Sequence, residues 1–256
     1  MQVIIAKDAD DVGEIAAGII ARRIETDDLS VLGVATGSSP LPVYRALERR
    51  HPAGLGELTV FALDEYVGLP YEHPESYHSV VEREVAAPLG LRRDRVHVPD
   101  GMADDLDDAC RRYEEAIDQA GGVDLQILGV GANGHIGFNE PTSSFTSRTR
   151  VKTLAQATRD DNARFFDRPE DVPIHCITQG LGTIMSARSV LLVAQGTAKA
   201  APVAAVVEGS VTSMCPGSIL QMHPDATIVV DEAAAAQLTL AEYYRFVYDN
   251  RPDWQR

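Results

Sequence analysis

Short apolar runs alternate with longer amphipathic segments along nearly the whole chain. The apolar runs predict buried strands at residues 2–5, 30–35, 58–63, 123–131, 189–195 and 226–232. The segments between them predict helices at residues 8–25, 40–50, 77–87 and 104–120, and an alanine-rich helix after each of the last two strands. This alternation is typical of βαβ units, so the sequence predicts an α/β fold with a mostly parallel sheet and helices on both faces.

No internal repeat and no linker divides the chain. Pro40 stands at the start of the second predicted helix, where proline is tolerated, and Gly121-Gly122 is a stop signal for the fourth. We therefore expect one domain over residues 1–256.

The composition restricts the class of protein. The 256 residues are 45% hydrophobic, carry a formal net charge of −15 and have a sequence pI of about 4.8. This acidity argues against a nucleic-acid partner, which needs a basic surface, but a few local cations can still hold a small anion. No apolar run approaches the ~20 residues that span a bilayer, and the N-terminus turns acidic too early for a secretory signal. We expect no membrane partner.

Neither a metal, nor a disulfide framework, nor a thiol nucleophile is expected. Cys110, Cys176 and Cys215 are scattered and form no C-x-x-C pair, which favours a reducing cytoplasm. Cys215 has no nearby base. The segment HPESYH brings two histidines and a glutamate together, but its spacing is not that of a helical zinc motif and Pro74 interrupts any helix.

In a parallel sheet of this kind, ligands bind beyond the carboxyl ends of the strands. The second predicted strand is followed by TGSSP, residues 36–40, at the start of a helix. Glycine, hydroxyl groups and the free N–H groups of a helix start suit a phosphate, and an ordinary turn with Ser39 as helix N-cap fits the same residues. The residues alone leave both interpretations open.

Asp64 and Glu65 follow the third predicted strand. A carboxylate in this place can be a base, a metal ligand or a helix cap. Because neighbouring side chains on an extended backbone point to opposite sides, we expect only one of the two to face a pocket.

The fourth predicted strand leads into GVGANGHIGFNEP, residues 129–141, which begins with the G-x-G-x-x-G pattern of a dinucleotide-binding turn. Such a turn must open a helix and normally follows the first strand. Here Gly137 and Pro141 disfavour a helix and the stretch lies mid-chain, so no NAD site is expected. The loop instead presents Asn133, His135, Asn139 and Glu140, which suit acid–base chemistry.

Together these loops resemble the glucosamine-6-phosphate deaminase family. The resemblance runs from about residue 31 to 231 and is carried by LDEYVGLPYEHPESYHS, GVGANGHIGFNEPTSSFTSRTRVKTL and TRDDNARFF. It implies a Rossmann-like three-layer α/β sandwich related to ribose-5-phosphate isomerase. It also implies a hydrolase of amino-sugar (N-acetylglucosamine) catabolism that converts D-glucosamine 6-phosphate and water to D-fructose 6-phosphate and ammonia, without cofactor or metal.

The resemblance also implies roles for single residues. His135 corresponds to the acid/base that opens the sugar ring, Asn133 and Glu140 to the groups that orient it, and Asp64 to the base that removes the proton from C2. The substrate phosphate is expected at Thr36, Gly37, Ser38, Ser39, Arg164 and Lys199.

Two departures from the family pattern affect these roles. Ser38 adds a side chain where many members have glycine, and Asn133 stands where some members have aspartate. An amide can orient His135 but cannot raise its basicity through charge.

Some relatives are hexamers activated by N-acetylglucosamine 6-phosphate. Ser143, Arg150, Lys152 and Thr153 correspond to that effector site, and the chain is therefore a possible homo-oligomer. The C-terminal segment diverges, however, and leaves Tyr243 and Tyr244 beside Arg245 as offset candidates for the tyrosine that completes the site.

Two other functions fit parts of this pattern. A 6-phosphogluconolactonase, or a deaminase for another amino-sugar phosphate, would share the fold, but a lactonase needs no base at C2. A catalytically silent sugar-phosphate sensor would usually carry a DNA-binding module, for which the chain has no spare segment or basic patch. The choice between glucosamine and galactosamine epimers stays open.

Overall fold

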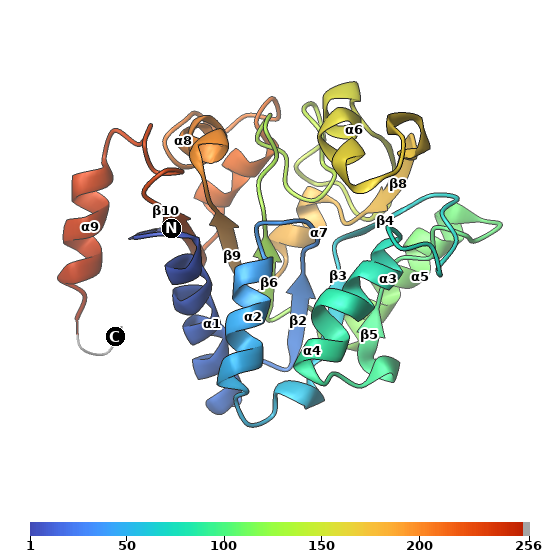
Figure 1. Cartoon of the computed structure of the whole chain (residues 1–256), viewed down its shortest axis with the longest axis horizontal. Coiled ribbons are helices and arrows are strands. Elements are labelled where there is room, and N and C mark those ends of the chain that lie inside the picture. The colour runs from blue at the N-terminus through green and yellow to red at the C-terminus, as the bar shows by residue number, and fades with distance from the viewer. Residues whose placement is uncertain (253–256) are drawn as a thin grey trace.

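Seven parallel strands form the centre of the structure (Figure 1). The computed structural model describes residues 1–252 of the chain. The strands follow one another across the sheet in the order β1 (Gln2–Ala6), β10 (Ala226–Asp231), β9 (Ser189–Ala194), β6 (Leu125–Leu128), β2 (Val31–Val34), β3 (Thr59–Ala62) and β5 (Val96–His97). β2, β6 and β9 are buried along their whole length, as expected for parallel strands covered on both faces. The predicted α/β class and parallel sheet are confirmed.

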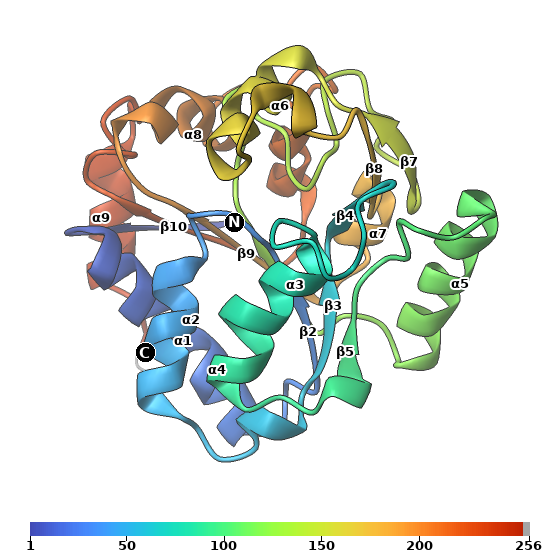
Figure 2. The same ribbon diagram turned by 45° about the vertical axis from the view of Figure 1, so that its right-hand side comes forward.

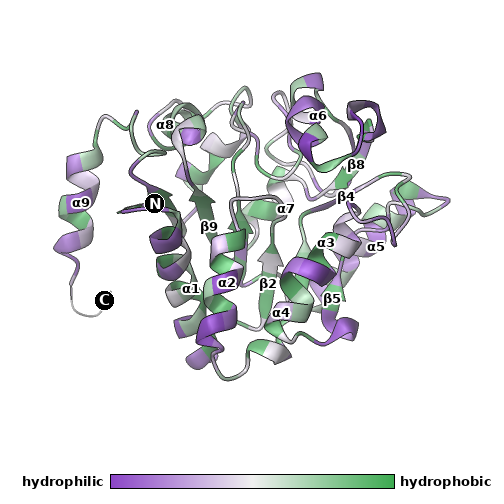
Figure 3. Cartoon of the chain, viewed as in Figure 1, coloured by the Kyte–Doolittle hydropathy of each residue, from purple (hydrophilic) through white to green (hydrophobic). Residues whose placement is uncertain are grey.

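Helices cover both faces of this sheet, which gives three layers. They are α1 (Ala9–Glu25), α2 (Leu41–Arg50), α3 (Tyr77–Val81), α4 (Ala87–Leu89), α5 (Leu106–Gln119), α6 (Gln156–Asn162), α7 (Leu181–Met185), α8 (Ala200–Val207) and α9 (Ala241–Asp249). α1, α2 and α4 lie on one side of the strands and α5 on the other (Figure 2). Hydrophobic residues are concentrated on the strands and the inner sides of the helices (Figure 3). Within residues 1–252, no helix has the length and apolar character that a membrane crossing requires.

A second, antiparallel sheet was not predicted. It consists of β4 (Asp64–Tyr66), β8 (His175–Thr178) and β7 (Arg150–Thr153). β4 follows β3 after the single residue Leu63, so the chain passes directly from one sheet into the other. These strands are three or four residues long and rich in polar residues, which leaves too little apolar periodicity for detection in the sequence.

The prediction of an alanine-rich helix directly after the last strand is wrong. Residues 232–237 form turns. The side chain of Asp231 accepts a hydrogen bond from the N–H of Ala234 at 2.7 Å and two more from the N–H of Gly196. A carboxylate that takes up local N–H groups competes with helix formation. The helix forms later, as α9, and packs against β1. Residues 253–256 of the divergent C-terminal segment lie outside the described residues.

The strand order creates a switch point between β2 and β6. From β2 the chain proceeds through β3 to β5 in one direction, and β6, β9 and β10 lie in the other direction. In open α/β sheets, ligands bind at such a point because the loops leaving the two strands diverge to opposite faces. The loops after β2 and β6 are the two glycine-containing segments that the sequence singled out.

Candidate active site

Three loops meet at the carboxyl ends of the central strands. A Cβ atom on Gly129, in the loop after β6, would lie 3.8 Å from Cβ of Ser39, in the loop after β2. The side chain of Gln195, after β9, donates to the carbonyl of Ser39 at 3.0 Å. Lys199 then donates from Nζ to the carbonyl of Val130 at 2.7 Å. The loop after β6 therefore lies beside Ser39 at Gly129 and is bonded to Lys199 at the next residue, Val130.

The loop of residues 36–39 leads into α2, whose start has no side-chain cap. Gly37 has φ = +86°, a conformation that a residue with a side chain rarely adopts. The N-cap of α2 is Pro40, which makes no side-chain capping bond. The alternative role of Ser39 as N-cap is therefore wrong. In the first turn of α2, Pro42 has no N–H group and the N–H of Val43 donates to the carbonyl of Pro40 at 2.9 Å. The N–H of Leu41 is therefore the backbone donor of this turn that an anion could use.

The loop after β6 forms no helix, as predicted, and is shaped around His135. The N–H of Gly131 donates to the carbonyl of His135 at 2.9 Å and closes the loop. A Cβ on Gly131 would lie only 2.1–2.4 Å from three atoms of the imidazole, so the ring is in direct contact with bare backbone. Sequence reasoning did not assign a role to Gly131, although its position in the glycine pattern was the available signal.

His135, Asn133 and Glu140 form a hydrogen-bonded chain. Nδ1 of His135 lies 2.7 Å from Oδ1 of Asn133, and Nδ2 of Asn133 donates to Oε2 of Glu140 at 2.8 Å. An ionised carboxylate can only accept, so Asn133 must present its NH₂ group to Glu140 and its oxygen to the ring. Nδ1 of His135 then carries the proton, and Nε2 is left as the acceptor.

Burial and hydrogen bonding set the charges of this chain. Burial lowers the pKa of His135, and the negative charge of Glu140 only partly opposes this effect. Burial alone would raise the pKa of Glu140, but hydrogen bonds from Thr158 and Asn133 outweigh it and hold the pKa below its ordinary value. Neutral His135 beside ionised Glu140 is the state that these effects favour near neutral pH.

Asp64 is a buried carboxyl that makes no side-chain hydrogen bond within residues 1–252; it is 5% exposed. Burial, with a smaller contribution from the charge of Glu65, raises its pKa to about 8. A Cβ on Gly137, two residues after His135, would lie 3.6 Å from Oδ2 of Asp64. The candidate base and the candidate ring-opening acid/base thus lie on adjoining segments.

Glu65 has a structural role. Its carboxylate accepts hydrogen bonds from the N–H groups of Tyr66, Tyr77 and His78 at 2.7–2.9 Å. These bonds fix the turn after β4 and the start of α3. The expectation that only one of the adjacent carboxylates faces a pocket is consistent with this arrangement.

The remaining candidates are placed less uniformly. Arg164 is exposed on the segment after α6 and stacks over the ring of Phe165. Burial lowers the pKa of Lys199, and the nearby positive charge of Arg164 lowers it further. Arg150 donates to Oδ1 of Asn139 at 2.7 Å, in the His135 loop. Of the other effector candidates, Ser143 is buried, Lys152 half-buried and Thr153 exposed. An effector site at these four residues stays a prediction.

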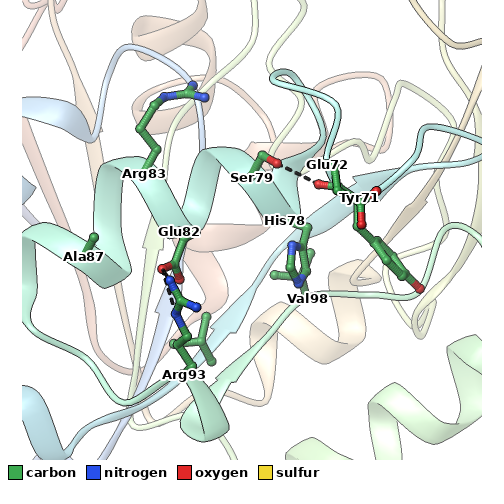
Figure 4. A pocket seen from close by; sticks show the side chains of 10 residues that line it. Tyr71, Glu72, His78, Ser79, Glu82, Arg83, Ala87, Arg93 and Val98 are labelled. Carbon is green, nitrogen blue, oxygen red and sulfur yellow. Dashed lines mark hydrogen bonds and ion pairs between the residues drawn. The ribbon is translucent and has the colours of Figure 1, made fainter.

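A separate cavity of about 400 Å³ lies between α3 and β5 (Figure 4). Its lining includes Tyr71, His78, Ser79, Val96 and Val98. Its arginines are already engaged: Arg93 is paired with Glu82 and Arg83 with Glu84. None of the candidate catalytic residues lines this cavity. Within residues 1–252, no three metal-ligating side chains are grouped as a metal site.

Residues 6–229 match the model of the family described as glucosamine-6-phosphate isomerases/6-phosphogluconolactonase. The chain belongs to this family. A glucosamine-6-phosphate deaminase of Pseudarthrobacter chlorophenolicus is 56% identical over 257 residues, which cover 100% of this chain and 99% of that protein.

Solved structures of the glucosamine-6-phosphate isomerase/6-phosphogluconolactonase family show the same architecture. One, described as a monomeric glucosamine-6-phosphate deaminase, is 40% identical with a TM-score of 0.89 and covers 93% of this chain and 100% of its own. A 6-phosphogluconolactonase from Trypanosoma cruzi is 21% identical with a TM-score of 0.75, covers 93% and 97% of the two chains, and shares the fold alone.

Proposed function

We propose that this protein is a glucosamine-6-phosphate deaminase, which converts D-glucosamine 6-phosphate and water to D-fructose 6-phosphate and ammonia. The observation that carries the proposal is the position of Asp64, buried and without a side-chain hydrogen bond, beside the loop of the His135–Asn133–Glu140 chain. Relatives at 51–56% identity over their full length bear the same name.

Ring opening requires a proton to move from the hydroxyl on C1 to the ring oxygen. Nε2 of His135 is the free acceptor of the ring because Asn133 holds the proton on Nδ1. It can take the hydroxyl proton and return it to the ring oxygen. Glu140 stabilises the transient positive charge through Asn133.

Removal of the proton from C2 needs a stronger base than an aspartate in water. The raised pKa of Asp64, about 8, supplies this basicity. It also keeps the Asp64 carboxyl mostly protonated in the free enzyme at neutral pH. The ammonium form of the substrate's 2-amino group is a neighbouring cation that favours the carboxylate. The resulting enolamine is protonated at C1, which leaves an imine at C2. Water adds to C2 and ammonia leaves, so the overall reaction is a hydrolysis.

The substrate phosphate is proposed to lie on residues 36–39 and the N–H of Leu41, with Lys199 and Arg164 as counter-charges. Lys199 is fixed by its bond to Val130. Arg164 is exposed in the described structure and would reach the phosphate from the segment after α6.

A 6-phosphogluconolactonase is the second candidate, since proteins with that activity share the fold. Hydrolysis of a lactone requires no base at C2, so Asp64 would have no chemical role there. A buried carboxyl without a partner lowers the stability of the fold, so a chemical role is needed to explain its presence. The deaminase reaction provides that role and lactone hydrolysis does not.

The decisive assay measures fructose 6-phosphate and ammonia formed from glucosamine 6-phosphate. We expect Asp64→Asn and His135→Gln to lower kcat by about 10²–10⁴-fold, because each removes a positioned acid or base. His51→Gln, at the exposed end of α2, is the control and should keep wild-type activity. A wild-type protein that does not deaminate glucosamine 6-phosphate but hydrolyses 6-phosphogluconolactone would reject the proposal. Full deaminase activity in Asp64→Asn would reject the role of Asp64.

Regulation and cellular setting are proposed more broadly. We infer a role in amino-sugar catabolism in the cytoplasm, without metal or cofactor. Activation by N-acetylglucosamine 6-phosphate through Ser143, Arg150, Lys152 and Thr153 in a homo-oligomer is to be tested by ultracentrifugation and by titration of the rate with that compound. A monomeric protein whose rate does not change with that compound would exclude it; one similar deaminase is described as monomeric.

A further inference from the structure

Glu140 connects the catalytic loop to a second element. One of its oxygens, Oε2, accepts from Asn133 at 2.8 Å. The other, Oε1, accepts from the hydroxyl of Thr158 at 2.5 Å and from the N–H of Ala155 at 3.2 Å. Both donors to Oε1 belong to α6 or its N-cap, so one buried carboxylate joins the His135 loop to α6.

The contact with Glu140 holds the N-terminal end of α6. Its N-cap, Ala155, has no side chain that could cap the helix. At the other end of α6, the side chain of Asn162 donates to the hydroxyl of Tyr66 at 3.1 Å. Thr158 is 4% exposed, so its hydroxyl has little access to water in place of Glu140. A buried hydrogen bond to a charged group contributes more than one between neutral groups.

The same segment carries a candidate phosphate ligand. α6 continues into a short 3-10 turn, Ala163–Phe165, which contains Arg164. A substrate phosphate held by Arg164 and a catalytic chain held by Thr158 would therefore fix the two ends of one short segment. Two further charged groups face His135 besides Glu140: Asp161 from α6 and Lys199 from the turn after β9.

We propose that Thr158 is a positioning residue for the deaminase reaction: by donating to Glu140 it fixes the orientation of Asn133, and thereby the ring tautomer of His135. The proposal rests on the proposed function. Without the Thr158 hydroxyl, Oε1 keeps only the longer bond from Ala155. Glu140 can then turn away from Nδ2 of Asn133. Without a fixed acceptor for its NH₂ group, the amide of Asn133 can rotate and present that group to Nδ1 of His135, which moves the ring proton to Nε2.

The test compares Thr158→Val, which removes the hydroxyl and keeps the shape, with Thr158→Ser, which keeps the hydroxyl. We expect Thr158→Val to lower kcat about tenfold with little change in KM, because Nε2 of His135 is then free to accept a proton in only part of the molecules. Thr158→Ser should keep kcat within about threefold of wild type. Thr183→Val is the matched control, since Thr183 makes the same kind of bond to Glu114 at 2.6 Å and touches no catalytic residue.

A second readout does not depend on turnover. Nitrogen NMR of histidine-labelled protein identifies the His135 ring as the signal missing from His135→Gln and reports which nitrogen is protonated. We expect the Nδ1–H form in wild type and Thr183→Val, and a mixture in Thr158→Val. A Thr158→Val variant with wild-type kcat and an unchanged tautomer overturns the proposal, as does a loss confined to KM. Wild type that binds but does not convert glucosamine 6-phosphate overturns the proposed function instead.

Discussion

Asn133 decides which nitrogen of His135 is available for proton transfer. Its amide has one donor side and one acceptor side, and ionised Glu140 fixes which side faces the ring. An aspartate in its place would put a second carboxylate beside Glu140, and like charges at that distance disfavour ionisation of both. Asparagine therefore orients the ring without competing for a proton.

Asp64→Asn is expected to stabilise the protein increasingly as pH rises from about 4 to 8. The folded-state pKa of Asp64 is about 8 against an ordinary value of 3.8, so the fold favours the protonated carboxyl. The stability contributed by that form is complete below pH 4 and is lost as pH rises toward 8, whereas the amide remains neutral throughout. Urea unfolding should show a gain on the order of 1 kcal/mol or more at pH 8 and a smaller one at pH 5.5.

The control for this prediction is Asp28→Asn, which removes one negative charge at an exposed position. If Asp64→Asn and Asp28→Asn change stability equally at both pH values, the fold does not favour the protonated form of Asp64.

At the scale of elements, close contacts between backbones determine how the helices lie. α1 and α2 pack side by side on one face of the sheet, and a Cβ on Gly13 of α1 would lie 2.5 Å from the carbonyl oxygen of Pro42 in α2. At Gly18 of the same helix, the nearest atoms are 4.0 Å away, at the end of the Arg50 side chain. The two glycines have the same helical backbone but different surroundings.

Gly13→Ala and Gly18→Ala are therefore expected to have opposite effects. Gly13→Ala should lower the free energy of unfolding by about 1–3 kcal/mol, because the new methyl group meets backbone that cannot move aside. Gly18→Ala should raise it by about 0.5–1 kcal/mol, because alanine loses less conformational entropy in a helix. Urea denaturation of the two variants measures both values, and a shared sign would contradict the packing described here.

The whole molecule combines a strongly acidic surface with a small cationic site. The net charge of −15 produces mutual repulsion in the folded state. Lys199 and Arg164 are the cations proposed for the phosphate, and the loop after β6, at the switch point, lies beside Ser39 and accepts a hydrogen bond from Lys199. The acidity of the chain is thus compatible with an anionic substrate because binding depends on these local groups.

An increase in salt from about 10 to 150 mM is expected to raise Tm by roughly 2–4 °C. At about 150 mM the screening length is ~8 Å, so repulsion between distant carboxylates weakens more than the attraction within close ion pairs. A shift of this size corresponds to ~1 kcal/mol in a chain of this length. Calorimetry in sodium chloride measures it, with sucrose at equal osmolality as the uncharged comparison, and a lower Tm in salt would show that attractive pairs dominate.

The sequence by itself determined the alternating fold and the main candidates for the site. Apolar runs long enough to be buried on both faces revealed the major strands, and Gly137 and Pro141 excluded the helix that a dinucleotide turn requires. The tertiary structure alone decided which residues meet. The second sheet was missed because its strands are short and polar. The bond from Thr158 to Glu140 spans 18 positions, and no local pattern encodes a contact made only when α6 folds over the loop. The unpaired burial of Asp64 likewise depends on the packing around it, since a residue's type does not specify its solvation.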